Sequence, residues 1–432
     1  MKKKKRKKKK NHFLNMILTF WSVFAGVIIL GILVFLLYRK EGEERAAEKG
    51  MEEMAEAVSD AVVEAIPEQE ENLPSEDQHI EELPPDEPKG KYDDILSDGE
   101  YMRENNIYAK EAAKEKEVTI AFAGDILFDP YYSVMSRLLQ RENGIHDSIS
   151  EDLMDEMISA DIMMINNEFP YSSRGTPTEG KQFTFRAKPE YASILQEMGV
   201  DIVSLANNHA YDYGEDAFLD TLDTLAGIEM PYVGAGRNLE EAASPVYFIA
   251  GDIKIAIVSA TQIERLDNPD TKGATDESPG VFRCLEPSKL LEVVQEAKEN
   301  SDFVIVYIHW GTENTVEIDW IQKDQAPKIA DAGADLIIGD HPHCLQPIDY
   351  VNGIPVVYSL GNFWFNSKEL DTCLVKAVID ENGLQSLQFV PALQKGCTTT
   401  MLHEGEKERV LAYMRSISPG VEIDGDGFIT QK

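Results

Sequence analysis

Residues 303–311 read FVIVYIHWG, an apolar run that ends in a histidine, a tryptophan and a glycine. The first six residues are all apolar and rich in Val and Ile, a composition typical of a β-strand buried on both faces. His309 stands where such a strand would end. Because ligands in open α/β sheets bind outside the carboxyl ends of the strands, we expect His309 to belong to a functional site.

Four other apolar runs end in polar residues of the same kind. They are 118–123 before Gly124 and Asp125, 162–165 before Asn166, Asn167 and Glu168, 200–205 before Asn207, Asn208 and His209, and 334–338 before Asp340, His341, Pro342 and His343. Helix-length segments separate these runs, which predicts buried strands in an α/β sheet. Five strand ends can therefore converge on one site.

The residue types at these ends are those that bind transition metals. Four of the eight histidines in the chain occur there, together with the carboxylates of Asp125 and Glu168. Imidazole and carboxylate suit Zn, Fe, Mn or Co, and a carboxylate that bridges two ions is the arrangement of a two-metal site. Each motif has an ordinary alternative, a turn for Gly-Asp and a helix cap for Asn-Asn-His. Taken together, the five strand ends predict a metal site.

Three other segments have competing interpretations. Arg186 could hold an anionic substrate group in a bidentate fork, or form a surface salt bridge. Gly361-Asn362-Phe363 ends the apolar run 356–360 and is typical of a glycine turn. Pro342 favours an extended backbone for the preceding His341.

A β-hairpin is predicted near the end of the chain. Residues 373–380 and 384–390 are separated by Glu381-Asn382-Gly383, and Asn-Gly supplies the left-handed geometry of a short turn. We expect this pair to belong to a second, antiparallel sheet. Apolar runs at 254–259 and 355–358 predict two further strands.

The amino-terminal segment predicts a membrane anchor. Residues 2–10 are nine consecutive basic residues, and residues 13–38 are 26 residues without a charged side chain. A helix of that length can cross a bilayer, whereas the apolar part of a cleaved signal peptide is only about 7–15 residues. A cleaved signal peptide and a buried core helix are the alternatives. We predict a cytoplasmic basic tail at 1–12, a transmembrane helix at 13–38, and the remainder outside the membrane.

Composition divides the rest of the chain. Residues 41–116 contain 25 acidic and 8 basic residues and five prolines, which predicts a largely disordered stalk with a possible short helix at 51–66. Residues 117–400 are expected to form the folded domain, and 401–432 a C-terminal helix and tail. The formal net charge of the chain is -36, which disfavours nucleic acid as a partner because phosphate binding needs clustered basic residues.

Six ordered motifs resemble the signature blocks of the CapA family of poly-γ-glutamate capsule biosynthesis proteins. They are Gly124-Asp125, Asn167-Glu168, 206–214 (ANNHAYDYG), His309-Trp310-Gly311-x-Glu313, 339–346 (GDHPHCLQ) and 358–363 (YSLGNF). The resemblance extends from about Val118 to Phe363. It implies a domain similar to the calcineurin-like metallophosphatases, namely a four-layer αββα sandwich with two divalent ions, of Mn, Zn or Fe.

The resemblance also implies a role for individual residues. The implied metal ligands are Asp125, Glu168, Asn208, His309, His341 and His343. His209 is implied as a proton donor or transition-state stabiliser, and Arg186 as a contact to substrate. Asn207, Asp212, Glu313 and Asn362 would orient these groups.

The chain departs from the family pattern at three places. Many relatives have a histidine at the position of Asp340, and an aliphatic residue at that of Cys344. A phosphatase-like Asp-x-His sequence is absent after Gly124, which would weaken or empty one metal position. Asp340 could be harmless, or could add a carboxylate near the metals.

Two functions agree with these features. The first is a membrane-anchored, extracytoplasmic hydrolase that acts on an anionic polymer or a phosphoester during capsule synthesis or export. The second is an assembly factor that binds polymer or membrane-bound capsule-synthesis proteins, with a structural or vestigial metal site. Metal analysis combined with hydrolysis assays would separate them.

Overall fold

The computed structural model describes residues 90–264 and 271–432. The predicted basic tail, the transmembrane helix, the possible helix at 51–66 and most of the predicted stalk lie outside these residues. Within the two described ranges, no helix combines the length and the apolar character needed to cross a bilayer.

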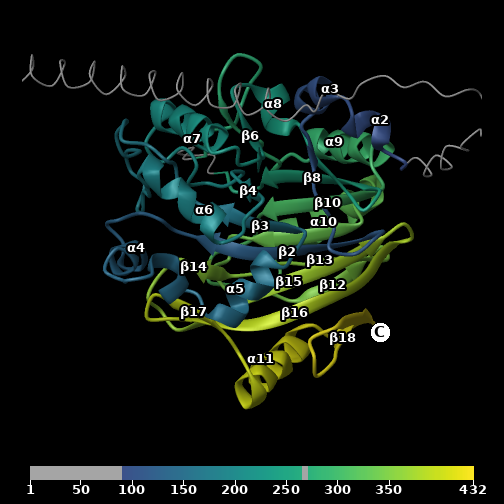
Figure 1. The fold of residues 1–432 in the computed structure, drawn as a ribbon. Helices are drawn as coiled ribbons and strands as arrows, with labels where there is room; N and C mark the ends of the chain where they lie inside the picture. The colour runs from purple at the N-terminus through teal and green to yellow at the C-terminus, as the bar shows by residue number, and fades with distance from the viewer. Residues whose placement is uncertain (1–89, 265–270) are drawn as a thin grey trace, which may run out of the picture. The chain divides into compact units, whose positions relative to one another are not determined.

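Two large β-sheets form the centre of the fold (Figure 1). Sheet I has the strand order β1 (Ile107–Ala109), β7 (Val246–Ala250), β8 (Ile253–Thr261), β10 (Phe303–His309), β11 (Leu336–Asp340), β13 (Ile354–Val357) and β12 (Ile348–Val351). Sheet II has the order β17 (Thr398–Met401), β16 (Gly383–Lys395), β15 (Leu370–Asp380), β2 (Glu117–Ile126), β3 (Ile162–Asn167), β4 (Ile202–Ser204) and β5 (Tyr232–Val233), and β14 (Asn362–Trp364) also pairs with β2.

Side chains on opposite faces of the strands enter different cores. Along β2, Ile120 and Phe122 pack between the two sheets, whereas Ala121 and Ala123 face the helices outside sheet II. This alternation follows from the two-residue period of a strand. Each sheet is thus buried on both faces, which explains why the strands read as continuous apolar runs.

Helices cover the outer face of each sheet, so the layers run helix, sheet, sheet, helix. The helices outside sheet II are α4 (Ser133–Leu138), α5 (Glu151–Ile158), α6 (Ser193–Glu197) and α7 (Glu215–Gly227), with 3₁₀ turns at Gly144–Asp147 and Pro189–Ala192. Those outside sheet I are α8 (Leu239–Ala243), α9 (Ser288–Glu299) and α10 (Trp320–Ala332). A two-stranded pair, β6 (Ala235–Gly236) and β9 (Gly280–Val281), lies beside α8.

The strands predicted from the apolar runs are confirmed, and so is the hairpin of β15 and β16. The expectation that this hairpin belongs to a separate antiparallel sheet is wrong. β15 pairs antiparallel with β2, from Leu374 opposite Ala123 to Asp380 opposite Glu117, and so extends the sheet of β2. The physical reason is that β15 is apolar on both faces, with Leu374 in the outer core and Val375 in the core between the sheets.

The folded region begins earlier than the composition predicts. Within residues 90–116 the chain forms α2 (Asp93–Leu96), α3 (Gly99–Glu104) and β1, and β1 pairs in parallel with β7. The prediction of an unfolded stalk therefore fails for this part. Ile107 is buried against the sheet, a tertiary contact that the average composition of a window cannot reveal.

The C-terminal segment forms α11 (Glu404–Ile417) and the strand pair β18 (Val421–Ile423) and β19 (Ile429–Gln431). In Figure 1 this segment lies below β16. Val410, Leu411 and Met414 of α11 join the core between the sheets, so this helix covers one border of that core.

Replacing Ile257 of β8, which is fully buried between the sheets, tests the importance of this core. We expect Ile257→Ala to lower the free energy of unfolding by about 2–5 kcal/mol, because it removes buried methyl groups and leaves a cavity. Ile158→Ala removes the same atoms at a position that is 54% exposed and should change stability by less than about 1 kcal/mol. Equal losses in the two variants, measured by denaturant unfolding, would contradict this packing.

Candidate metal centre

The predicted site residues meet where strand ends of the two sheets come together. Sheet II supplies Asp125 at the end of β2, Glu168 directly after β3 and Asn208 in the loop after β4. Sheet I supplies His309 at the end of β10, and β11 ends opposite it with Asp340 paired to His309 in register. The convergence of five strand ends is therefore observed.

Close approach of two chain segments is built into this end of β2. The Asp125 N–H donates to the Gly361 carbonyl at 3.2 Å. A β-carbon on Gly124 would lie 1.9 Å from that same carbonyl oxygen, so only glycine fits at position 124. The glycine turn predicted at Gly361 thus also places Asn362 beside the site.

Glu168 lies at the centre of the cluster. Its side chain is fully buried, and neither carboxylate oxygen has a hydrogen-bond partner among the described residues. Burial raises the pKa of Glu168 well above its ordinary value, and the charges of Asp125 and Asp340 raise it further. An unpartnered carboxyl group at this depth is unfavourable unless a cation balances it.

The two ring nitrogens of His309 have different neighbours. Its Nδ1 lies 2.9 Å from Asp340 Oδ1, while its Nε2 lies 2.8 Å from Asn208 Oδ1, 3.0 Å from His341 Nδ1 and 3.7 Å from Glu168 Oε1. Burial lowers the pKa of His309 to about 3, so the ring is neutral. A neutral ring whose Nδ1–H donates to Asp340 presents a lone pair at Nε2. The lone pair at His309 Nε2 is thus directed toward Asn208 Oδ1, which also carries lone pairs, and toward His341 Nδ1.

Three overlapping groups of side chains place ligand atoms within 4.8 Å of one another. They are Glu168, His309 and His341; Asp125, Glu168 and His343; and Asp125, His309 and Asp340. The first two share Glu168, which suits a carboxylate that bridges two ions. In the third, Asp340 Oδ1 accepts the Nδ1–H of His309 and fixes its orientation, whereas Asp340 Oδ2 has no hydrogen-bond partner among the described residues.

His343 and Asp125 form the other half of the cluster. His343 Nδ1 lies 2.9 Å from Asp125 Oδ2 and 2.8 Å from Asn362 Oδ1. Burial lowers the pKa of His343, but the hydrogen bond and charge of Asp125 outweigh it, so the pKa is raised overall. Asn166 Nδ2 donates to the other oxygen of Asp125 at 2.8 Å. Asn362 and Asn166 therefore orient this pair.

The backbone that carries the two loop histidines is strained. His341 has φ 94° and His343 has φ 57°, both in the left-handed region that residues other than glycine rarely adopt. The extended backbone expected for His341 is therefore wrong. Such strain is typical of residues that the surrounding structure holds in position for a function.

His209 faces the cluster from the loop after β4. Its Nδ1 lies 2.7 Å from Asp212 Oδ2, its Nε2 lies 3.9 Å from Glu168 Oε1, and its ring packs on Phe185 with the centroids 4.3 Å apart. Burial lowers the pKa of His209, against the opposing effect of Asp212. Asn207 accepts the backbone N–H of His209 at 3.0 Å and donates to Asn166, as expected of a supporting residue.

Two predicted site residues lie apart from the cluster. The Arg186 guanidinium donates to the Arg174 carbonyl at 3.1 Å and lies 4.1 Å from the centroid of the Tyr213 ring. Glu313 is exposed and makes no hydrogen bond to the cluster within the described part of the chain, although its charge raises the pKa of Glu168. The geometry does not support an orienting role for Glu313, and substrate contact by Arg186 stays a prediction.

Three residues of the site were not assigned a role from the sequence. Asp340 and Asn166 stand at predicted strand ends, and Asp340 also departs from the family pattern, but the sequence assigns neither a definite role. Lys181 carries no sequence signal, since it lies in a long loop, yet its side chain is only 4% exposed and its ammonium pairs with Asp212 at 2.5 Å.

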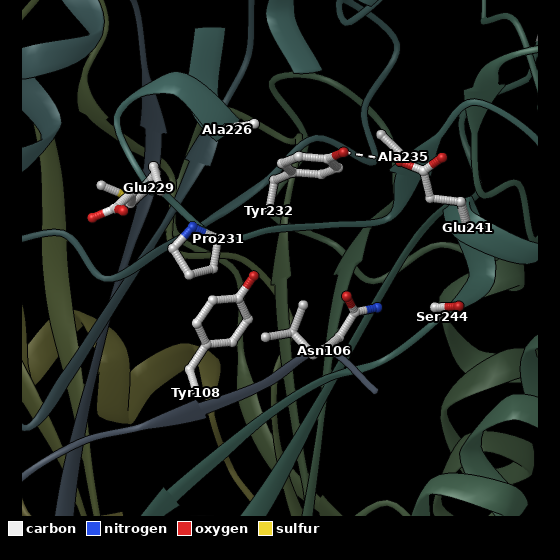
Figure 2. Close-up of a pocket in the computed structure, with 11 residues that line it drawn as sticks. Asn106, Tyr108, Ala226, Glu229, Pro231, Tyr232, Ala235, Glu241 and Ser244 are labelled. Carbon is white, nitrogen blue, oxygen red and sulfur yellow. Dashed lines mark hydrogen bonds between the residues drawn. The ribbon is translucent and has the colours of Figure 1, made fainter. Parts of the chain in front are cut away.

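A separate cavity of about 600 Å³ lies between α7, α8 and the edge strands β1 and β5. Figure 2 shows Tyr108 and Tyr232 in its wall, and the Tyr232 hydroxyl donates a hydrogen bond to Glu241 Oε1 at 2.9 Å. It includes none of the residues of the cluster. The metal-ligand cluster at the strand ends therefore lies outside this cavity.

Known proteins resemble this chain. The model of the bacterial capsule synthesis protein PGA_cap family matches residues 119–367. The PGA biosynthesis protein CapA of Bacillus subtilis (strain 168) is 30% identical over 281 residues, covering 63% of this chain and 71% of the relative. The capsule biosynthesis protein CapA of Bacillus anthracis is 30% identical over 311 residues, which cover 69% of this chain and 72% of the relative. A probable polyglutamine synthesis accessory protein of Mycobacterium tuberculosis is 28% identical over 213 residues, which cover 48% of this chain and 56% of the relative.

Asp340→Asn tests the explanation of the His309 orientation. The variant keeps the shape of the side chain and removes the charge that holds the Nδ1–H. We expect Mn²⁺ affinity to fall by about 10–100-fold, the usual effect of losing an outer carboxylate behind a histidine ligand. Asp331→Asn changes an exposed carboxylate of α10 and should leave affinity unchanged. Calorimetric titration of the detergent-solubilised full chain measures both, and equal affinities would reject the role of Asp340.

Proposed function

The chain belongs to the bacterial capsule synthesis protein PGA_cap family, and from this premise we propose that it acts in synthesis or export of a poly-γ-glutamate-type capsule through a metal-dependent, hydrolase-like site. The observation that carries the proposal is the buried Glu168 carboxylate, which has no partner among the described residues and lies amid further ligand atoms. The helix, sheet, sheet, helix layering agrees with the metallophosphatase-like fold that the family resemblance implies.

The residues present fit two divalent ions. Asp125, Glu168 and His343 would hold one, and Glu168, Asn208, His309 and His341 the other. This mixture of imidazole, amide and carboxylate suits Mn, Zn or Fe. When bound, such ions supply Lewis acidity to a substrate oxygen and lower the pKa of water. Both sheets supply ligands, and the packing of the two sheets would hold these ligands in place without the ions.

His209 is the proposed proton carrier. Asp212 accepts its Nδ1–H and leaves Nε2 free on the side of Glu168. A neutral imidazole in this orientation accepts a proton at Nε2 as the nucleophile loses one, and returns it to the leaving oxygen or nitrogen. Asp212 stabilises the imidazolium that exists between these two transfers.

The substrate is proposed to be a phosphoester or a polyglutamate-like amide. Residues 117–432 contain 52 acidic and 22 basic residues, so the surface as a whole repels a polyanion. Binding of an anionic polymer must therefore be local, through bound metal and the few basic groups near the site. Arg186 is the basic side chain proposed for this contact, which requires it to leave the Arg174 carbonyl.

The protein is further proposed to be anchored in the cell membrane by residues 13–38, with its N-terminus in the cytoplasm and its C-terminal domain outside. Nine basic residues before an uncharged run of 26 support this orientation. Capsule-synthesis membrane proteins are the partners that such a location would bring within reach.

One observation favours a non-catalytic alternative. Asp125, Glu168 and His309 are fully buried, and the side chain of His343, at 17%, is still mostly covered. Sealed ligand sets are typical of structural ions, whereas catalytic sites keep an open position. In that case the domain would serve as a polymer- or partner-binding assembly factor.

Substitution of the two histidines separates catalysis from assembly. In the full chain purified in detergent, we expect bound metal and metal-dependent hydrolysis of a phosphodiester or of poly-γ-glutamate. His209→Ala should abolish turnover and retain metal, because it removes the proton carrier, whereas His341→Ala should lose both. His403→Ala is the control, since His403 is exposed and lies outside the site.

Two results would count against the enzyme. A wild-type chain without metal would reject the metal centre. Metal without turnover, together with normal capsule formation by His209→Ala, would favour the assembly factor.

Protease treatment of intact cells tests the orientation. With an epitope tag before Met1, we expect external protease to remove the folded domain and to leave a tagged fragment of the amino-terminal segment in the membrane fraction. Permeabilised cells should lose the tag as well. Full protection of the domain in intact cells, with digestion after permeabilisation, would show that the proposed orientation is wrong.

A further inference from the structure

A long loop between β3 and the 3₁₀ turn at Pro189–Ala192 lies against the loop that carries Asn208 and His209. The Thr178 N–H donates to the Asp212 carbonyl at 2.8 Å, and the Phe185 N–H donates to Asp212 Oδ2 at 2.7 Å. Gly175, at φ 82°, is so close that a β-carbon would lie 1.9 Å from the Tyr213 carbonyl oxygen. Loops of this length without regular structure are often functional.

Lys181 is the buried charge of this loop. Its ammonium donates to the backbone carbonyl of Asn208 and to Asp212 Oδ1, and the side chain is only 4% exposed. Asp212 is fully buried and accepts from three sources, the Lys181 ammonium, the Phe185 N–H and His209 Nδ1. A buried carboxylate is stable when a cation and hydrogen bonds satisfy it in this way.

The two acceptors of Lys181 lead to two different parts of the site. The Asn208 carbonyl belongs to the residue whose side-chain oxygen lies 2.8 Å from His309 Nε2. The Asp212 carboxylate belongs to the residue that orients His209. One ammonium thus links the backbone of a metal-ligand residue to the partner of the proton carrier, without reaching the cluster itself.

We propose that Lys181 is a positioning residue that holds Asn208 and the His209–Asp212 pair in register with the metal-ligand cluster. The inference rests on the proposed metal centre. Because the ammonium is buried and already engaged by two acceptors, Lys181 acts through Asn208 and Asp212 and not by contact with substrate. The loop around it is then part of the site, and its attachment sets the geometry of the ligands.

The first test is a double-mutant cycle on Mn²⁺ affinity in the detergent-solubilised full chain. Lys181→Met keeps the length of the side chain and removes the ammonium, and we expect it to weaken binding about tenfold or more. In the background of Asn208→Ala the same change should weaken binding by less than about twofold, because the two residues act as one unit. Lys188→Met, at an exposed position nearby, should have no effect.

The second test does not depend on metal. Hydrogen exchange of the Phe185 amide, which donates to Asp212, should become faster in Lys181→Met and stay unchanged in Lys188→Met. If Lys181→Met fails to fold, Lys181→Gln keeps an N–H donor and should show the same changes to a smaller degree.

The outcomes separate this inference from the proposed function. Unchanged affinity and unchanged exchange in Lys181→Met would overturn the role of Lys181 and leave the metal centre intact. Equal losses of affinity with and without Asn208 would also overturn it, since Lys181 would then not act through Asn208. A wild-type chain that binds no Mn²⁺ rejects the metal centre itself, and faster exchange at Phe185 would then leave Lys181 as a support of His209 and Asp212 alone.

Discussion

The carboxylate of Glu168 is the constraint on which the site depends. It lies fully buried, both oxygens lack a hydrogen-bond partner in the described part of the chain, and burial together with Asp125 and Asp340 raises its pKa. Protein interiors rarely leave such groups unmatched. The surrounding side chains do not relieve it, because His309 Nε2 and Asn208 Oδ1 also present lone pairs. A bound cation would satisfy all of these groups together.

The two-sheet architecture explains how so many ligand atoms meet. Sheet II contributes Asp125, Glu168 and Asn208, and sheet I contributes His309 and the loop with His341 and His343. The apolar core between the sheets holds these strand ends at a fixed separation. Damage to this core should therefore affect the site at a distance, through the relative placement of the sheets and not through any ligand.

The positions of the candidate ligands could be predicted from the sequence because each follows an apolar run. Buried parallel strands are readable as continuous Val- and Ile-rich segments, and their carboxyl ends meet at one edge. The contribution of β15 to the sheet of β2 was not predictable, since pairing between distant strands leaves no local pattern. The same reason explains why the early start of the fold at β1 was not predictable, since β1 pairs with the distant strand β7.

Some side chains at the site lie in sequence motifs, and others reach it only through the fold. Asn362 contacts His343 and Asp212 contacts His209, and both residues lie within motifs of the family resemblance. Lys181 stands at a loop position that none of the six motifs includes, and only the fold brings its ammonium to Asp212. Arg186 differs from Lys181, since its residue type suggests substrate binding while its guanidinium lies over the Tyr213 ring, and its contact with substrate stays a prediction.

Electron paramagnetic resonance of the Mn²⁺-loaded full chain tests the central claim most directly, because it distinguishes one ion from two that share a ligand. Two ions that share the Glu168 carboxylate should give the multiline signal of a spin-coupled pair in the wild type. Glu168→Gln should convert it to the signal of isolated ions, since the shared carboxylate is lost. A wild-type spectrum with only isolated or free Mn²⁺ would contradict the account.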